Sequence, residues 1–322
     1  MADPMIEADG LFKTYGRTRA LAGVSFSVPA GSVLGFLGPN GAGKTTAVRI
    51  LTTLALPDAG RARVAGIDVL AHPAAVRRQI GVAAQDATLD GLLTGRQNLA
   101  LVGELSGMRT SQARARAAEL LGSFELADAA DRVVKGYSGG MRRRLDLAAS
   151  LVTRPPVLFL DEPTTGLDPV SRQRVWEMIR ELIGSGVTVL LTTQYLDEAD
   201  ALADRIVVVN HGQVIADGTP RELKVHSRSA HVEVTLAEPG PEAEQVIAPL
   251  VSGRVSVSAD GLRLDAAADS APGLATVLVR ALDQAGMLVD NIEVRQPSLD
   301  DVFFALTGAD IPVTTTDQVR KG

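Results

Sequence analysis

The residues best suited to binding or catalysis in this 322-residue chain lie in the segment GPNGAGKTT at 38–46. It fits G-x-x-x-x-G-K-[ST], follows an apolar run and precedes the helical pattern AVRILTTL. The glycines allow a tight turn that points backbone N–H groups at phosphate, and the following helix adds positive charge at its amino end. Lys44 can then reach β/γ-phosphate oxygens and the Thr45 hydroxyl suits Mg²⁺, whereas the alternative is a plain turn with an exposed lysine. The predicted phosphate-binding residues are Gly38, Pro39, Asn40, Gly41, Ala42, Gly43, Lys44, Thr45 and Thr46.

Two adjacent carboxylates form a second candidate. Asp161 and Glu162 end the apolar run VLFLD that starts at Val157. A buried parallel strand would deliver both side chains to the sheet edge where ligands bind. Asp161 is suited to anchoring Mg²⁺, and Glu162 to orienting or deprotonating a water molecule. The alternative is an ordinary acidic residue pair at a strand end.

A third candidate is the turn Ser138-Gly139-Gly140, which precedes a helical pattern. A serine hydroxyl and two exposed glycine amides at a helix start can form a second phosphate-binding surface, or simply a helix N-terminus with a flexible lead-in. The following Arg142–Arg144 are expected to be solvated charges on the helix surface, with contact to phosphate or to a neighbouring subunit as the alternative.

Alternating strands and helices must position these groups. Residues 1–225 alternate β-rich apolar runs with helical patterns, which predicts an α/β domain with a largely parallel sheet covered on both faces. The expected strands are 33–38, 157–161, 187–193 and 205–210. Between about Thr94 and Pro156 the strand patterns vanish, which predicts a helical insert.

A smaller α+β domain is expected over residues 226–308. After the apparent linker VHSRSAH at 225–231 the pattern order is βαββαβ, which suits a split-βαβ domain, followed by a helix at 298–308 and a frayed tail at 309–322. The expected elements are strand 230–236, helix 241–250, strands 253–258 and 261–265, helix 271–286 and strand 287–295.

Composition and charge exclude several classes of protein. The chain has no cysteine, which excludes disulfides, thiolate metal sites and a cysteine nucleophile. Residues 226–308 carry five Arg and twelve acidic residues, so the first 225 residues are near neutral and a nucleic-acid partner is not expected. No apolar stretch is long enough to span a membrane, and the acidic start MADPMIEADG lacks the features of a signal peptide, so we expect a cytosolic protein.

Together, the three motifs resemble the nucleotide-binding subunit of an ATP-binding-cassette (ABC) transporter. The family signature is usually LSGGQ; here Ser138, Gly139 and Gly140 match, while Tyr137 and Met141 replace Leu and Gln. The resemblance implies a P-loop ATPase core that binds ATP and Mg²⁺. It also implies that the turn Ser138-Gly139-Gly140, referred to below as the Ser138 edge, closes on the nucleotide held by a second copy of the chain.

Further positions acquire roles from the same resemblance. Tyr15 matches the aromatic residue that stacks on adenine, although a half-buried tyrosine before a turn explains it locally as well. Gln85 matches the glutamine that links Mg²⁺ and water to the helical insert. Asp168 matches the loop that crosses the dimer seam, but it could also cap the helix beginning near Pro169.

One position departs from the family pattern. In TTQYLDEAD the chain has Gln194 where the family usually has histidine. Glutamine can hydrogen-bond the γ-phosphate but cannot change its charge near neutral pH. We therefore expect Glu162 to carry the chemistry and ATP turnover to be slow.

A narrower resemblance covers about residues 5–308. The strings TYGRTRAL, SGGMRRRLDLAASL, TTQYLDEAD and PSLDDVFFALTG are together similar to the daunorubicin/doxorubicin-resistance ATP-binding subunits. This branch implies a peripheral ATPase on the cytoplasmic face of the membrane, docked on a separate integral-membrane permease that exports drug-like compounds. The alternatives are a cassette ATPase acting on DNA or ribosomes and a regulatory subunit that senses ATP.

Overall fold

The chain forms two compact units, Met1–Pro220 and Arg221–Gly322. The computed structural model describes residues 4–84, 89–226, 229–240, 242–252, 255–269 and 273–295. Among these residues, no helix combines the length and apolar character needed to cross a membrane. The predicted helix at 298–308 and the tail at 309–322 lie outside the described residues.

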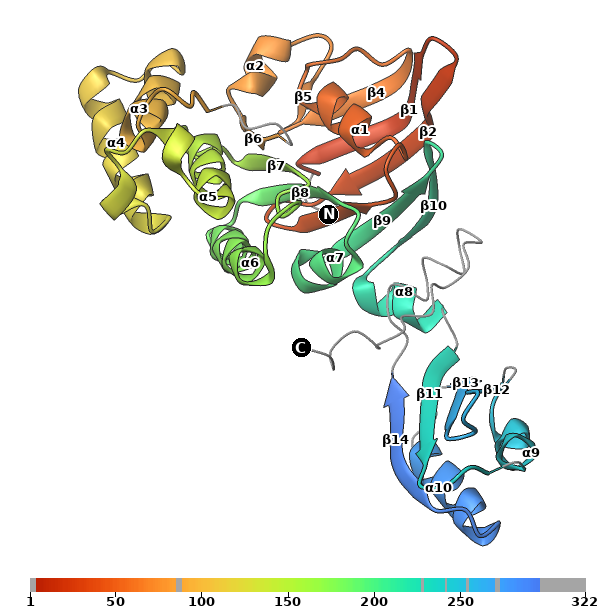
Figure 1. Ribbon diagram of the computed structural model, residues 1–322. Coiled ribbons are helices and arrows are strands. Elements are labelled where there is room, and N and C mark those ends of the chain that lie inside the picture. Colours follow the sequence, from red (N-terminus) through yellow and green to blue (C-terminus); the bar gives the residue numbers. More distant parts are fainter. Residues whose placement is uncertain are drawn as a thin grey trace. The chain divides into compact units, whose positions relative to one another are not determined.

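The first unit contains two sheets (Figure 1). An antiparallel sheet has the order β2 (Thr18–Val28), β1 (Ile6–Tyr15), β4 (Ala59–Val64) and β5 (Ile67–Asp68). A mixed sheet has the order β10 (Gln213–Gly218), β9 (Arg205–Asn210), β3 (Val33–Leu37), β8 (Thr188–Thr193), β7 (Val157–Asp161) and β6 (Ile80–Ala83). Its pairs are parallel except for β9 with β10.

Apolar side chains from both sheets and from two helices form the main core. Phe26 of β2 and Phe36 of β3 pack with their ring centroids 5.1 Å apart. Ala47, Ile50 and Leu51 of α1 (Lys44–Leu51) are buried in the same cluster. Strands β3, β7 and β8 are buried along their whole length; β3 and β7 are almost entirely apolar, whereas β8 begins and ends with buried threonines.

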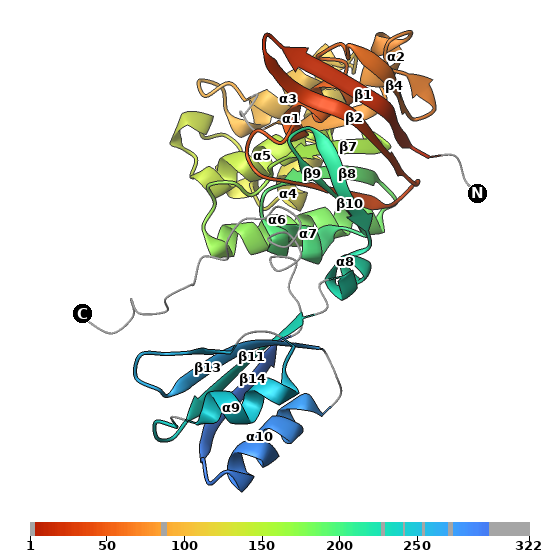
Figure 2. The same ribbon diagram turned by 90° about the vertical axis from the view of Figure 1, so that its right-hand side faces the viewer.

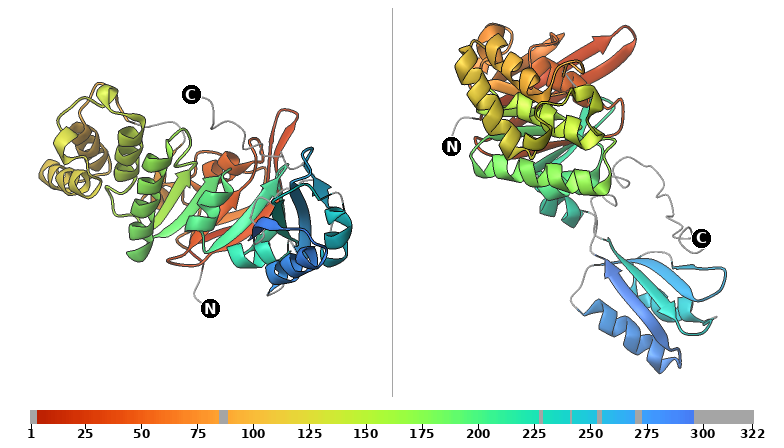
Figure 3. Two further views of the ribbon diagram at one scale, coloured as in Figure 1. Left: turned by 60° about the horizontal axis from the view of Figure 1, so that its bottom comes forward. Right: turned by 60° about the vertical axis from the view of Figure 1, so that its left-hand side comes forward.

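The remaining helices of this unit fall into two groups. One group accompanies the sheets and comprises α2 (Pro73–Arg77), α6 (Pro169–Gly184) and α7 (Leu196–Leu202). The other is the expected helical insert, which lies beside the mixed sheet rather than over its whole face (Figure 3). It comprises α3 (Gly95–Leu105), α4 (Thr110–Ser123), the 3₁₀ turns η1 (Ala127–Ala129) and η2 (Val134–Gly136), and α5 (Gly139–Ser150).

The second unit has its own sheet and core. Its sheet has the order β12 (Ser256–Val257), β13 (Arg263–Asp269), β11 (Ser229–Leu236) and β14 (Val289–Arg295), with every pair antiparallel. The described part of this unit also contains α9 (Ala243–Ile247), the 3₁₀ turn η3 (Ala248–Leu250) and α10 (Leu274–Gln284). Figure 2 shows α9 and α10 on the same face of this sheet. The chain order β11-α9-β12-β13-α10-β14 is that of two interleaved βαβ motifs.

The connection between the units differs from the linker expected over 225–231. The helix α8 (Pro220–His226) begins with proline and has Glu222 in its first turn, both of which favour a helix start. Strand β11 then begins at Ser229. The division between the compact units falls after Pro220, rather than after Val225.

Candidate functional site

The segment 38–46 is the turn between β3 and α1. The backbone N–H of Gly38 donates a 3.2 Å hydrogen bond to the carbonyl of Thr193, which ties the turn to the end of β8. A Cβ on Gly38 would lie 2.4 Å from the carbonyl oxygen of Val209, so a larger residue cannot fit. Gly43 has φ 107°, a left-handed conformation that favours glycine, and it caps the start of α1. The turn therefore presents backbone at the amino end of a helix, as phosphate binding requires.

Lys44 points back over this turn. Its Nζ donates hydrogen bonds of 2.8 Å to the carbonyl of Gly38 and 3.2 Å to that of Pro39. The same nitrogen lies 3.2 Å from Oε1 of Glu162, and the two side chains are only 5% and 6% exposed. The structure thus places a buried cation at the turn and a buried carboxylate beside it.

Asp161 and Glu162 stand at the carboxyl end of β7. The Thr45 hydroxyl lies 3.5 Å from Oδ1 of Asp161, and the Thr192 hydroxyl donates to the same oxygen. The backbone N–H of Glu162 donates a 3.1 Å hydrogen bond to the carbonyl of Thr192, and Glu162 has φ 49°. A carboxylate and a hydroxyl at this separation are hard oxygen donors of the kind that Mg²⁺ prefers.

Sheet order explains why these groups converge. Strand β8 lies between β3 and β7, with Leu37 opposite Thr193 and Asp161 opposite Thr192. Because all three strands are parallel, their carboxyl ends meet at one edge of the sheet. The turn at 38–46, called the phosphate-loop turn below, lies at this edge, and so do Asp161 and Glu162.

The Ser138 turn forms a separate surface. Ser138 caps α5, and its hydroxyl accepts a 3.3 Å hydrogen bond from the backbone N–H of Met141. Ser138 and Gly139 are exposed. A Cβ on Gly140 would lie 2.8 Å from the hydroxyl of Ser171 on α6, so a larger residue there would need the Ser171 side chain to shift. A hollow of about 130 Å³ opens beside this turn, lined by Ser138, Gly140, Met141, Arg144, Val170, Ser171 and Arg174.

Tyr137, which replaces the usual leucine, is an internal residue. Its side chain is buried, and its hydroxyl donates a 2.6 Å hydrogen bond to the carbonyl of Ala129. Burial raises the pKa of the Tyr137 phenol. The substitution therefore lies within the helical insert and leaves the exposed Ser138 edge intact.

The expectation of three solvated arginines is wrong for two of them. Arg142 is exposed, but the side chains of Arg143 and Arg144 are only 12% and 14% exposed. Arg144 pairs with Glu125 at 3.0 Å. Both guanidinium groups reach backbone carbonyls of neighbouring loops, which compensates their burial.

Four further predicted residues have different outcomes. Tyr15 ends β1 with its side chain 46% exposed, and the Lys13 ammonium lies 5.4 Å from its ring centroid. Asp168 caps α6 and accepts hydrogen bonds from the amide and hydroxyl of Ser171, which lower the pKa of its carboxyl. Gln194 is half-buried and directly follows β8. Gln85 lies outside the described residues.

Sequence reasoning missed Glu198 on α7. Its side chain is fully buried, and Oε1 accepts hydrogen bonds from the Thr164 hydroxyl at 2.7 Å and from Trp176 Nε1 at 3.1 Å. Burial raises the pKa of the Glu198 carboxyl. Its place on the face of α7 that also carries Ala199 and Leu202 is the signal that could have identified a buried acid.

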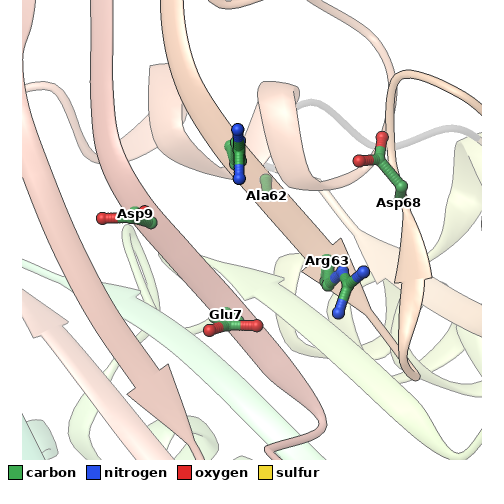
Figure 4. Close-up of a pocket in the computed structure, with 6 residues that line it drawn as sticks. Glu7, Asp9, Ala62, Arg63 and Asp68 are labelled. Atoms are coloured by element: carbon green, nitrogen blue, oxygen red, sulfur yellow. The ribbon is translucent and has the colours of Figure 1, made fainter.

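A hollow of about 320 Å³ on the antiparallel sheet is of a different kind (Figure 4). In the strand register Glu7 lies opposite Arg63, Asp9 opposite Arg61, and Arg63 opposite Asp68. Opposite charges in facing positions stabilise a solvent-facing sheet surface. Backbone N–H groups of the following turn donate to Asp68 and lower the pKa of its carboxyl. We interpret this surface as structural.

Comparisons with known proteins agree on one family. The family model described as "ABC transporter" matches residues 21–165. The chain is 53% identical over 310 residues to the daunorubicin resistance ATP-binding protein DrrA3 of Streptomyces coeruleorubidus, covering 96% of this chain and 98% of that protein. It is 50% identical over 318 residues to the daunorubicin/doxorubicin resistance ATP-binding protein DrrA of Streptomyces peucetius, covering 98% and 96%.

A solved structure supports the same conclusion. The chain resembles the ATP-binding cassette MJ0796, solved as a dimer in a post-hydrolysis state with ADP and Pi. The TM-score is 0.62 at 28% identity, and the match covers 67% of this chain and 98% of the other.

Proposed function

The chain belongs to the ABC transporter family, and from this premise we propose that it is the ATP-binding and ATP-hydrolysing subunit of a drug exporter. Its relatives are named for ATP binding and for daunorubicin or doxorubicin resistance. The observation that carries the proposal is the convergence of Lys44 and Thr45 with Asp161 and Glu162 at one sheet edge.

The phosphate-loop turn would hold the triphosphate mainly through backbone N–H groups, with Lys44 moving from Glu162 to the β/γ oxygens. Thr45 and Asp161, together with Gln85, would hold Mg²⁺, which neutralises charge on the phosphates when bound. Once Lys44 has turned to the nucleotide, Glu162 would no longer be paired with Lys44 and could orient or deprotonate the attacking water. Gln194, after the neighbouring strand, would donate a hydrogen bond to the γ-phosphate.

A second copy of the chain would complete each site. Ser138 and Gly139 are exposed at the start of α5, so their hydroxyl and amide groups are accessible to a nucleotide held by another protomer. Asp168 would lie at the seam and Tyr15 would stack on adenine. Two copies would close around two MgATP, and closure would move a separate integral-membrane permease, which would hold the chain at the cytoplasmic face of the membrane.

Mixing two inactive variants tests this arrangement. Lys44→Ala removes the phosphate-binding cation, and Ser138→Arg blocks the opposing edge, so each variant alone should lose ATPase activity. A mixed dimer has one composite site with both residues intact and one with neither. We therefore expect mixing to restore activity, measured as phosphate release. Full ATPase activity in both single-variant homodimers would exclude the shared site.

Copurification tests the partner. We expect the chain, expressed with its neighbouring genes, to copurify with a polytopic membrane protein that has no cassette of its own. Recovery only with soluble partners would contradict the exporter proposal while leaving the ATPase assignment in place.

A further inference from the structure

The side chain of Arg143 joins α5 to the loop that contains Glu162. Its Nε donates a 2.6 Å hydrogen bond to the carbonyl of Pro163, and its Nη2 donates one of 3.0 Å to the carbonyl of Asp161. These two carbonyls belong to the residues on either side of Glu162. The guanidinium group thus holds the backbone immediately before and after the proposed base.

The loop that contains Glu162 has a backbone conformation that must be stabilised by contacts. Glu162 has φ 49°, a left-handed backbone conformation that is unfavourable for residues other than glycine. Such a conformation persists only where surrounding contacts hold it. Arg143 supplies two of these contacts, and the Thr192 carbonyl supplies a third by accepting from the Glu162 amide.

The same side chain reaches a third segment. Nη1 donates a 2.7 Å hydrogen bond to the carbonyl of Ala84, the residue that precedes Gln85. It also lies 3.3 Å from the buried carboxylate of Asp146, one turn along α5. Arginine can make these contacts at once because its planar group carries five N–H donors and no acceptor. A lysine has only one nitrogen and cannot reproduce them.

The position of Arg143 on α5 connects these contacts to the Ser138 edge. Ser138 caps this helix, and Arg143 follows it by little more than one turn. A displacement of the Ser138 edge would therefore move Arg143 with it, because both belong to one short rigid helix.

We propose that Arg143 is a positioning residue for ATP hydrolysis. It holds Glu162 in its orientation, and this orientation changes with the position of α5, the helix that begins at the Ser138 edge. This inference rests on the proposed function. It predicts that Arg143 acts on the Glu162 of its own protomer, while the Ser138 of that protomer contacts the nucleotide of the other.

Substitutions with a matched control test the role. Arg143→Met should lower kcat by about 100-fold, the effect of a small misplacement of a reacting group, while ATP affinity stays within about threefold of the parent. Arg143→Lys should retain more activity than Arg143→Met because it keeps one charged donor. The control is Arg116→Met: the Arg116 side chain is 14% exposed and donates to the carbonyls of Leu151 and Val152, away from the two acids. It should leave kcat unchanged even where it lowers the melting temperature.

Mixed dimers separate the effect of Arg143 on the ATP site of its own protomer from its effect on the site of the other protomer. One protomer carries Lys44→Ala, so only the site built on the phosphate loop of the other protomer turns over. Arg143→Met should abolish most activity when placed in the protomer with intact Lys44, and much less when placed in the Lys44→Ala protomer. Equal loss from both placements would overturn the assignment of Arg143 to Glu162. Failure of the parent mixed dimer to hydrolyse MgATP would instead count against the proposed function.

Hydrogen–deuterium exchange gives a readout that does not depend on turnover. In the nucleotide-free chain, Arg143→Met should raise exchange at peptides covering 159–168, whereas Arg116→Met should raise it only near 151–154. Unchanged exchange over 159–168, or a kcat of Arg143→Met that falls only in proportion to the folded fraction, would refute the positioning role.

Discussion

The ammonium nitrogen of Lys44 lies 3.2 Å from Oε1 of Glu162, and both side chains are buried. The cation proposed to bind phosphate and the carboxylate proposed to activate water are therefore each other's partners in this structure. A nucleotide must replace Glu162 beside Lys44 before Glu162 can act on water.

Glu162→Gln should separate binding from hydrolysis. The amide cannot accept a proton, so kcat should fall by about 10²- to 10⁴-fold, the usual contribution of a general base. ATP binding should persist, because Lys44 and the backbone of 38–46 remain. Steady-state ATPase and size-exclusion chromatography with ATP measure the two effects. Glu177→Gln, an exposed change on α6, serves as the control, and a Glu162→Gln chain with parental kcat would remove Glu162 from the proposed role.

The buried pair should also appear in stability. Lys44→Met leaves the Glu162 carboxylate in place without the neighbouring ammonium, and removing one partner of a buried ion pair costs about 3–5 kcal/mol. Adding Glu162→Gln should recover part of this loss, because the remaining partner is then neutral. Urea unfolding can be followed by the fluorescence of Trp176, the single tryptophan of the chain. A double variant no more stable than Lys44→Met would show that the two side chains are not coupled.

Gln194→His should accelerate ATP turnover. Gln194 follows β8, next to the Thr193 carbonyl that accepts from the amide of Gly38, so it stands at the edge of the phosphate loop. Histidine can carry a positive charge or transfer a proton, and a well-placed donor is worth about 3 kcal/mol to a transition state, or up to about 100-fold in rate. The measurement is steady-state ATPase at saturating MgATP. If the histidine variant is slower than the parent, glutamine is not a compromise at this position.

Glu198 should make stability depend on pH. Burial raises the pKa of its carboxyl, so the folded protein keeps this proton at pH values where the unfolded chain has released it. The contribution of Glu198 to stability is therefore complete below the ordinary carboxyl pKa, and it is lost as the pH rises through the raised pKa of the folded state. Glu198→Gln removes this loss and keeps an oxygen acceptor for Thr164 and Trp176.

As the pH rises through that window, the free energy of unfolding of Glu198→Gln should thus increase relative to that of the parent. Above the window the difference between the two should be constant. Urea unfolding at a series of pH values, with Glu177→Gln as the control, measures this difference. A difference that does not vary with pH would mean that Glu198 titrates alike in the folded and unfolded chains.

Local patterns predict much of the fold. The strand at 33–37, the turn with Gly43 and the helix from Lys44 are neighbours in the chain, so residue type and spacing are sufficient to recognise them. The apolar run that ends at Asp161 is a strand in the structure, as expected. Ser138 caps α5, as its place before a helical pattern suggests.

Patterns were insufficient where burial depends on distant segments. Arg143 and Glu198 are ionisable residue types that are usually found at the surface, yet both are buried because loops and helices from elsewhere supply their partners. Likewise, Tyr137 differs from the family signature, but only the packed helical insert shows that its hydroxyl is used internally.

The sequence by itself determined the phosphate-loop turn, the acidic strand end and the capped helix at Ser138, because each depends on residues within one or two turns of the chain. Only the tertiary structure decided that Lys44 pairs with Glu162 and that Arg143 holds the backbone on both sides of it. The physical reason is the strand order, since β8 between β3 and β7 brings the three strand ends to one edge, and strand order depends on side-chain packing across the whole sheet.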